Sequence, residues 1–221
     1  MLRFNSSAAF FLLSIIVLFN ISCAKQVKLE TEVYFNDFES GNSTGIQNLK
    51  VVDFFQTKVA GFYNNQELLV EINNLPKHAV AIIDFDLYIH DSWDGNSLEG
   101  DGIGGPDIWK FSVDDKNYIN TTFSNTYCEP GRHCPPQSYP NDYPNNNNLP
   151  RAGVFSTMPG VCLEANNPSG TSLYKISKTI KHNSNKMLLS FKDLLVQKNT
   201  SNPLCDESWS IDNIRVRVIE L

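Results

Sequence analysis

The sequence has no cluster of basic residues. Its 221 residues include 18 lysines and arginines against 24 aspartates and glutamates, which gives a formal net charge of −6. The basic side chains are scattered along the chain. Because proteins that bind nucleic acids normally carry a basic patch or stripe, this distribution argues against a nucleic-acid partner.

Segments with helical periodicity and internal repeats are also missing. After the first apolar run, residues 8–19, no segment approaches the eighteen apolar residues of a membrane-spanning helix. Hydrophobic residues still make up 41% of the chain and aromatic residues 11%, which is enough for a core. The length suits one β-sandwich with long loops better than two domains.

Catalytic signatures are absent as well. There is no Ser-His-Asp arrangement with an elbow motif and no His-Glu-x-x-His motif. A glycosidase needs two carboxylates that face each other across a cleft, and only Asp84 and Asp86 share a strand face, together with His90. Polar residues in such alternation more commonly form the exposed side of a half-buried sheet. We therefore expect no catalysis, and a glycan-active hydrolase that uses Asp84, Asp86 or Glu39 is only a second alternative.

The N-terminal region has the features of an export signal. Arg3 precedes the apolar run 8–19, which is too short and too close to the start for an ordinary membrane span. Residues 1–22 are predicted to be a signal peptide, residues 23–31 a linker and residues 32–221 one β-sandwich domain. The segment that ends at Cys23 resembles a lipoprotein cleavage box, although Asn20 replaces its preferred aliphatic residue. We expect lipidation of Cys23, with ordinary cleavage near Ser22 or Ala24 as the alternative.

The remaining four cysteines are Cys128, Cys134, Cys162 and Cys205. An even number of cysteines in an exported chain indicates disulfides, and four cysteines allow three pairings. We favour a local bridge between Cys128 and Cys134 and a long-range bridge between Cys162 and Cys205. A zinc site that includes His133 is the alternative, but the spacing matches no usual structural zinc pattern.

The pattern of the remaining residues predicts a series of short strands. Residues 79–90 form the clearest one, with Ala81, Ile83, Phe85, Leu87 and Ile89 on one face. The other expected strands are residues 32–35, 51–55, 59–63, 68–72, 108–113, 118–123, 173–180, 187–191 and 209–219. Residues 126–170 contain eight prolines and the run 145–148 of asparagines, which exclude regular structure over most of this loop. We therefore predict an all-β, two-sheet antiparallel β-sandwich of jelly-roll type with about ten strands and a long Pro/Asn-rich loop.

Two groups of acidic residues are candidate ligands for calcium. The loop that follows residues 79–90 carries Asp91, Asp94, Asp101 and Asp107 among five glycines, and glycines let backbone carbonyls turn inward. The second group is Asp37, Glu39 and Asp212, near the two chain ends that a jelly roll brings together. Calcium gathers six to eight oxygen ligands, so either group predicts a structural calcium ion. Solvated carboxylates and turn caps are the alternative.

Aromatic residues beside the acidic loop are candidates for ligand contact. Trp93 and Trp109 stand at its two edges, and Asn96 lies between them. With Asp94, these residues predict a surface on which a sugar could stack. Buried packing is the more common role of large aromatics.

Three segments together resemble a known group of proteins. They are Asp91-Ser92-Trp93-Asp94-Gly95-Asn96 with Gly105-Pro106-Asp107-Ile108-Trp109, then Thr121-Thr122-Phe123-Ser124-Asn125, and finally Asp206-Glu207-Ser208-Trp209-Ser210-Ile211-Asp212-Asn213. The sequence is similar to a loosely defined, largely uncharacterised group of exported bacterial proteins with a jelly-roll, lectin-like or galactose-binding-like domain. Ser210 departs from the glycine that is more frequent in the group. The resemblance covers most of residues 33–219. It implies a fold and export from the cytoplasm, but no established activity.

These observations lead to one functional expectation. The chain should be an exported, surface-anchored and calcium-stabilised binding module that recognises carbohydrate or another surface ligand. A structural or adhesive envelope protein without a small-molecule ligand is the alternative. We expect contact with the membrane only through a lipid anchor at Cys23, and nothing in the sequence indicates the oligomeric state.

Overall fold

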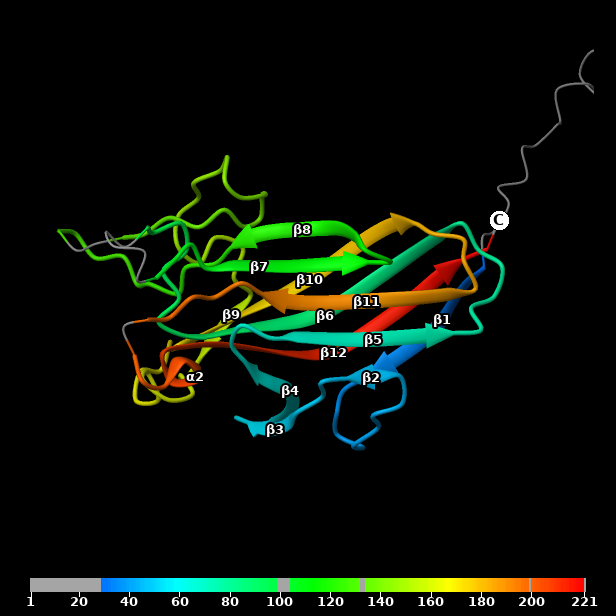
Figure 1. Cartoon of the computed structure of the whole chain (residues 1–221), viewed down its shortest axis with the longest axis horizontal. Helices are drawn as coiled ribbons and strands as arrows, with labels where there is room; N and C mark the ends of the chain where they lie inside the picture. Colours follow the sequence, from blue (N-terminus) through cyan, green and yellow to red (C-terminus); the bar gives the residue numbers. More distant parts are fainter. Residues whose placement is uncertain (1–28, 99–103, 132–133, 199, 221) are drawn as a thin grey trace, which may run out of the picture.

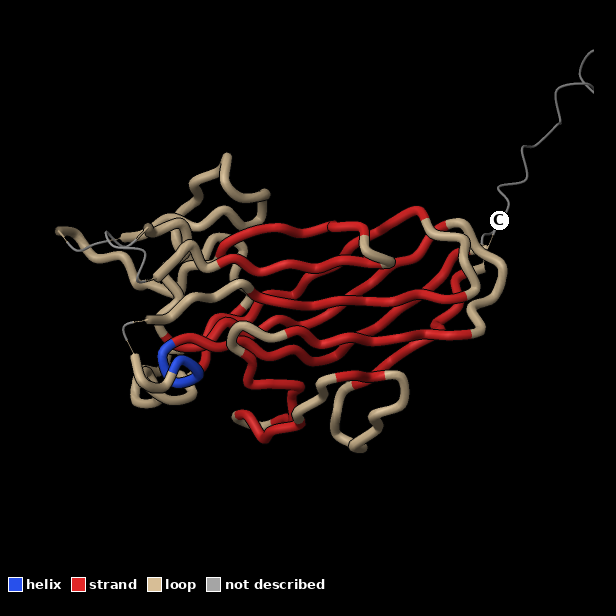
Figure 2. Tube along the Cα trace, in the orientation of Figure 1, coloured by secondary structure: helices blue, strands red, loops and turns tan. Residues whose placement is uncertain are grey.

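The computed structural model describes residues 29–98, 104–131, 134–198 and 200–220. They form a two-layered, almost entirely β structure (Figures 1 and 2). The elements are β1 (Glu30–Asn36), β2 (Ile46–Gln47), β3 (Val51–Phe54), β4 (Thr57–Tyr63), β5 (Glu67–Asn73), β6 (Val80–Asp91), β7 (Ile108–Val113), β8 (Lys116–Thr122), β9 (Ser156–Met158), β10 (Thr171–Lys181), β11 (Lys186–Asp193), α2 (Pro203–Asp206) and β12 (Glu207–Ile219). No helix within these residues has the length and apolar character needed to cross a membrane.

The strands form two antiparallel sheets. The seven-stranded sheet has the order β3-β4-β12-β6-β10-β9, with β1 also paired to β12. The five-stranded sheet has the order β2-β5-β11-β7-β8. From β4 onward, the chain changes sheets at almost every connection, so that β4-β12-β6-β10 faces β5-β11-β7-β8. This order confirms the predicted jelly-roll sandwich.

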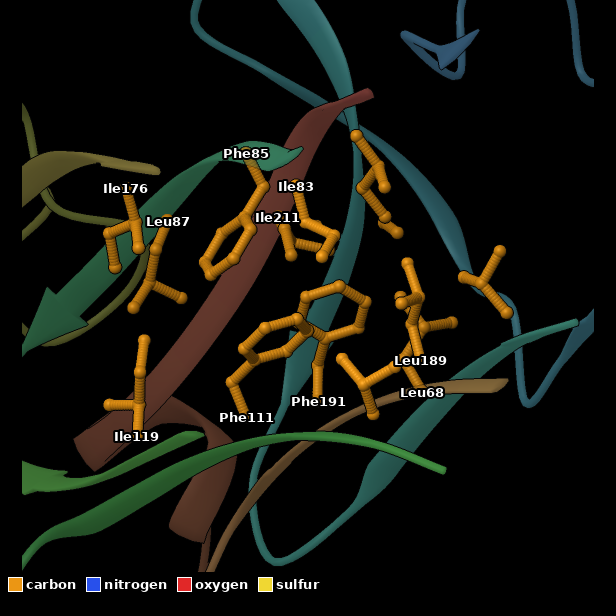
Figure 3. Packing of buried hydrophobic residues seen from close by; sticks show 14 of the residues in the cluster. Leu68, Ile83, Phe85, Leu87, Phe111, Ile119, Ile176, Leu189, Phe191 and Ile211 are labelled. Atoms are coloured by element: carbon orange, nitrogen blue, oxygen red, sulfur yellow. The ribbon is translucent and has the colours of Figure 1, made fainter. Parts of the chain in front are cut away.

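The core lies between the sheets, and alternation along the strands explains its composition. Side chains of successive residues in a strand point to opposite faces, and the five residues expected to face the core from β6 are all buried there. Figure 3 shows Phe85 of β6 against Phe111 and Phe191 of the opposite sheet. Its ring centroid lies 5.2 Å from that of Phe111 and 5.1 Å from that of Phe191. These contacts join the two layers.

The strand predictions are confirmed for the ten longer segments, with small differences at their ends. The sequence does not predict β2, β9 or α2, which have two to four residues each. Such elements are too short to show a period. For β2 and β9, the strands with which they pair, rather than their own sequences, define the element.

The Pro/Asn-rich loop is packed against the sandwich through one buried glutamine. Oε1 of Gln137 accepts hydrogen bonds from the backbone N–H groups of Ser124 and Arg151, at 3.1 and 2.9 Å. Its Nε2 donates to the carbonyls of Tyr139 and Ala152. Because Gln137 is completely buried, the loop is built around a satisfied polar centre.

Both favoured disulfides are present. Cys128 is bonded to Cys134, and their Cα atoms lie 5.2 Å apart. Cys162 is bonded to Cys205 with a Cα–Cα distance of 5.0 Å, which links the loop after β9 to α2. The predicted lipidation residue, Cys23, lies outside the described residues.

Candidate functional site

The longest loops gather at one end of the sandwich, on the left in Figure 1. Within the described residues, they comprise residues 92–98 and 104–107 between β6 and β7, residues 123–131, 134–155 and 159–170 around β9, and residues 194–198 and 200–202 between β11 and α2. Loops at the ends of a rigid scaffold are common carriers of binding and catalytic residues. This end therefore collects polar side chains from distant parts of the sequence.

Asp107, at the end of the loop between β6 and β7, bonds to residues near the start of the same loop. The side chain is completely buried directly before β7. Its Oδ2 accepts hydrogen bonds from the backbone N–H groups of Asp94 and Gly95, at 2.5 and 2.9 Å. Gly95 has a φ of +72°, and a Cβ atom there would lie only 2.3 Å from the carbonyl oxygen of Pro136. Glycine is therefore required at this tight turn.

Three carboxylates meet beside this turn. Asp94, Asp107 and Glu207 each offer an oxygen, and the three atoms lie within 4.8 Å of one another. Asp107 and Glu207 are buried, whereas Asp94 is half-buried. Oδ1 of Asp107 is buried and has no hydrogen-bond partner. In the part of the chain that the structure describes, no other group of acidic, histidine and cysteine side chains meets the same criterion. We call these residues the acidic triad.

The triad is electrostatically unfavourable without a cation or bound protons. Burial raises the pKa of Asp107 well above its ordinary value, and the charge of Asp94 adds to this effect. The pKa of Glu207 is also raised, mainly by burial and then by the charges of Asp107 and Asp94. A hydrogen bond from Nε2 of Gln197 to Glu207 opposes the shift. Like charges in a desolvated site disfavour joint ionisation, and a divalent cation would reverse that effect.

A small cavity of about 160 Å³ opens beside the triad. It is lined by Ser92, Asp94, Gly104, Gly105, Gln197, Asp206 and Glu207. At Gly105, φ is +61° and a Cβ atom would lie 2.0 Å from the carbonyl oxygen of Ser97. Only glycine can therefore occupy this position. The volume exceeds that of a single water molecule. A cation and part of its hydration shell would fit.

The donor set fits a hard cation. All three side chains of the triad are carboxylates, and a flip of the Gln197 amide would present a fourth oxygen. Calcium accepts six to eight oxygen ligands in flexible geometry, whereas zinc prefers nitrogen and sulfur ligands. Asp94 and Asp107 were predicted as ligands from the sequence, but Glu207 was not. The only signal for Glu207 was its position in the Asp-Glu-Ser-Trp segment.

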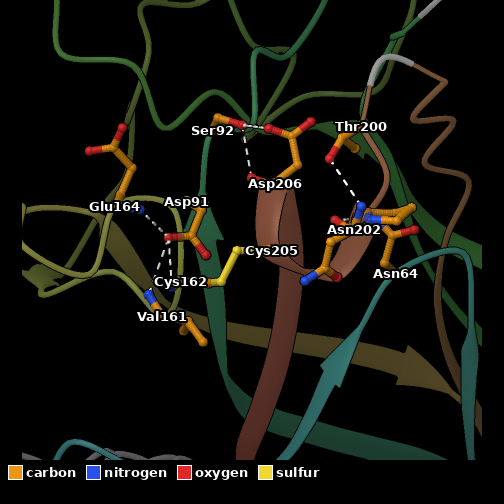
Figure 4. Close-up of a disulfide and its surroundings, with 11 residues drawn as sticks. Asn64, Asp91, Ser92, Val161, Cys162, Glu164, Thr200, Asn202, Cys205 and Asp206 are labelled. Atoms are coloured by element: carbon orange, nitrogen blue, oxygen red, sulfur yellow. Dashed lines mark hydrogen bonds between the residues drawn. A yellow bond between two sulfur atoms is a disulfide. The ribbon is translucent and has the colours of Figure 1, made fainter.

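Asp91, the other acidic residue of this loop that the structure describes, lies apart from the triad. Asp91 ends β6, and its Oδ1 accepts hydrogen bonds from the backbone N–H groups of Val161, Cys162 and Glu164, at 3.2, 3.3 and 3.0 Å (Figure 4). It thereby holds the loop that follows β9. Burial is the main reason why its pKa is raised. Asp101 lies outside the described residues.

The acids near the two chain ends are neighbours, as expected, but form no comparable group. The hydroxyl of Thr57 lies 2.8 Å from Oε1 of Glu39 and 3.2 Å from Oδ2 of Asp212. Burial raises the pKa of Asp212 to about 7, and the charges of Asp86 and Asp37 contribute to the shift. Among the described residues, these acids do not bring three ligand atoms within the separation seen in the triad.

The two tryptophans are core residues. Trp93 and Trp109 are both completely buried, and both rings pack against Phe123, at centroid distances of 6.4 and 6.2 Å. The expectation that they offer a stacking surface is therefore wrong. Asn96 also has a structural role, since its Nδ2 donates to the carbonyl of Asn146 and to Oδ1 of Asn147.

The residues considered for catalysis are held by other side chains. Asp84 forms an ion pair with Arg217 at 2.7 Å, and Asp86 forms one with Lys175 at 3.0 Å. Glu39 is exposed, and hydrogen bonds from Lys58 and Thr57 lower its pKa. A general acid needs a raised pKa, so Glu39 is poorly suited to that role.

Comparisons with known proteins give distant structural similarities. No family model matches the sequence, and no curated protein matches it. One similar structure is a GH115 4-O-methyl-alpha-glucuronidase with specificity for decorated arabinogalactans, at 12% identity over 84% of this chain and a TM-score of 0.39. This chain spans 17% of the length of that enzyme. Another is the C-terminal CBM6 of a marine laminarinase from Zobellia galactanivorans, at 10% identity over 86% of this chain and 98% of the module, with a TM-score of 0.34. At these values, neither similarity carries an argument about activity.

Proposed function

We propose that this chain is an exported, non-catalytic binding module in which a calcium ion at Asp94, Asp107 and Glu207 orders the loops that recognise carbohydrate. The observation that carries the proposal is the completely buried carboxylate of Asp107. One of its oxygens closes the turn at Asp94 and Gly95, while the other lies unpaired and buried. A buried polar atom without a partner is costly, and a calcium ion would satisfy it.

Calcium also explains why the cluster draws on separate parts of the chain. Asp94 and Asp107 belong to the loop between β6 and β7, whereas Glu207 begins β12. An ion held by all three would fasten two loops at the end of the sandwich. Binding to the folded state alone stabilises that state, so calcium would act as a structural element of the binding surface.

Export is supported by the two disulfides, since such bonds persist mainly outside the cytoplasm. The predicted signal peptide and the lipid anchor at Cys23 belong to the same proposal. Absence of catalysis is supported by the ion pairs that hold Asp84 and Asp86. A structural or adhesive envelope protein would share the cation site but lack a sugar ligand.

Thermal unfolding of the purified protein tests the cation site. We expect excess calcium to raise Tm relative to a chelator, by roughly 5–10 °C at a hundred times Kd. The variant Asp107→Asn should lose this shift. The matched control is Asp115→Asn, an exposed residue of the β7–β8 turn, which should keep it. An unchanged Tm in the wild-type protein, without heat of calcium binding in calorimetry, would remove the cation from the proposal.

A further inference from the structure

A second, larger cavity lies at the same end of the sandwich. Its volume is about 530 Å³, within the usual range of small-molecule sites. It is lined by Asp91, Ser92, Asn125, Thr126, Tyr127, Arg151, Glu164, Asn167 and Gly170. These residues come from the end of β6 and from both halves of the long loop around β9, and Figure 4 shows Asp91, Ser92 and Glu164 near the Cys162–Cys205 disulfide.

The walls of this cavity are held in place by internal hydrogen bonds. Arg151 donates from Nη2 to the carbonyls of Asn125 and Ser169, at 2.5 and 2.7 Å. Asn125 in turn donates to the carbonyls of Asp91 and Gly170, at 2.8 and 2.7 Å. A site whose walls are already ordered loses little entropy when a ligand binds. The cavity is therefore preorganised.

The lining combines polar side chains with one exposed ring. Tyr127 is 70% exposed, which leaves its ring available at the rim. Glu164 accepts a hydrogen bond from Asn167 through Oε2, and Thr126 also lies in the lining. Sugars are recognised by this combination, because a ring has an apolar face for stacking and hydroxyls that both donate and accept hydrogen bonds.

The charges select among sugars. Two carboxylates, Asp91 and Glu164, line the cavity against one guanidinium, that of Arg151, and the chain as a whole carries a net charge of −6. Asp91 is buried and its Oδ1 is held by three backbone N–H groups, so one carboxylate and one guanidinium remain. An acidic sugar would be repelled by Glu164, and an amino sugar by Arg151. Like-charge contacts discriminate against unwanted partners. A neutral sugar can use the carboxylate as an acceptor and the guanidinium as a donor.

We propose that this cavity binds a neutral sugar ring, which stacks on Tyr127 and forms hydrogen bonds with Glu164, Asn167 and Arg151. The inference rests on the proposed function and specifies its ligand and site. It also gives the cation site a role in recognition. Ser92 lines both cavities, and its hydroxyl lies 2.8 Å from both the carbonyl oxygen and Oδ1 of Asp206, the residue before Glu207 (Figure 4).

Calorimetry in calcium buffer tests the site with defined probes. The probes are neutral oligosaccharides of glucose, galactose, mannose and xylose, an oligogalacturonate as the acidic arm and glucosamine as the amino arm. We expect binding to at least one neutral probe and a loss of affinity of at least fivefold in Tyr127→Ala and Asn167→Ala. The matched control is Phe55→Ala, whose ring is 66% exposed in the β3–β4 turn, and it should bind as the wild type does.

The results separate this inference from the function on which it rests. Neutral-sugar binding that Tyr127→Ala weakens at least fivefold, in a variant that keeps its calcium-dependent Tm shift, supports the cavity as the site. Binding of a neutral sugar at this site without any calcium shift would overturn the cation site but not the cavity. A calcium shift with no neutral-sugar binding, with binding only of charged probes, or with binding unaffected by both cavity variants would overturn the inference.

Discussion

The indole N–H of Trp209 donates a 2.5 Å hydrogen bond to Oδ2 of Asp193 in the interior of the sandwich. The ring of Trp109 lies edge-on to that of Trp209, at a centroid distance of 6.0 Å, yet its own indole N–H is buried without a partner. Both side chains are completely buried. Of these two neighbouring tryptophans, only Trp209 therefore has a hydrogen-bond partner for its indole N–H.

This difference predicts unequal costs of substitution by phenylalanine. Trp209→Phe should lower the free energy of unfolding by about 1–3 kcal/mol more than Trp109→Phe, because only the former removes a hydrogen bond to a buried carboxylate. Urea unfolding followed by far-UV circular dichroism measures both. Trp93→Phe, which loses a bond to the Ser208 carbonyl, is the control for loss of a neutral acceptor. Equal costs at positions 109 and 209 would contradict the explanation.

The two functions of Asp107 can be separated by two substitutions. Asp107→Asn keeps an oxygen for the N–H groups of Asp94 and Gly95 but removes the charge, so it should fold in chelator at least as stably as the wild type and gain nothing from calcium. Asp107→Ala should be less stable by about 2–4 kcal/mol, because two backbone donors lose their acceptor. Thermal and urea unfolding of the wild type and both variants, each measured with calcium and with chelator, test these expectations. A normal calcium response in Asp107→Asn would contradict the role of its carboxylate.

His90 predicts acid sensitivity that is independent of the cation site. The imidazole is completely buried, with Nδ1 2.9 Å from Oγ1 of Thr171 and Nε2 2.7 Å from Oγ of Ser210. Burial lowers its pKa from 6.5 to about 3. The unfolded chain therefore binds one proton more than the folded chain between these values. The stabilising contribution is complete above pH 6.5 and decreases by about 1.4 kcal/mol per pH unit as the pH falls toward 3.

The variant His90→Gln removes this titration and keeps an amide that can bond to the same hydroxyls. Urea unfolding at pH 7.5 and at pH 4.5 should show a smaller loss of stability on acidification in the variant than in the wild type. Contributions of the carboxylates occur in both proteins and cancel in the difference. An identical loss would mean that His90 is not kept neutral.

The fold could be predicted from the sequence because its main strands have strong local patterns. Along β6, alternation of apolar residues such as Ile83, Phe85 and Leu87 identifies the face that packs on the core. Aromatic residues in the acidic loop were harder to interpret. Trp93 is surrounded in the sequence by Asp, Ser and Gly, but Asp107 folds the loop back and the ring enters the core.

The candidate site could be predicted only in part, for a topological reason. Asp94 and Asp107 lie in one loop, whose glycines and acids suggested a cation. Glu207 joins them because β12 pairs with β6, with Glu207 opposite Asp91. No local period encodes a pairing between strands so far apart in the chain. The cavity near Arg151 depends in the same way on contacts across the long loop.

The two disulfides should differ in their contribution to stability, because they close loops of different length. Residues 162 and 205 are 43 positions apart, whereas residues 128 and 134 are 6 apart. The chain-entropy estimate gives about 4 kcal/mol for the long loop and about 2 kcal/mol for the short one. Cys162→Ser with Cys205→Ser should therefore lower the free energy of unfolding more than Cys128→Ser with Cys134→Ser.

The long-range bridge also lies beside the Asp91 contacts with residues 161–164, so its removal should weaken sugar binding while leaving the calcium shift measurable. Equal losses of stability would contradict the dependence on loop length, and unchanged sugar affinity would show that the Asp91 contacts hold the loop without the disulfide.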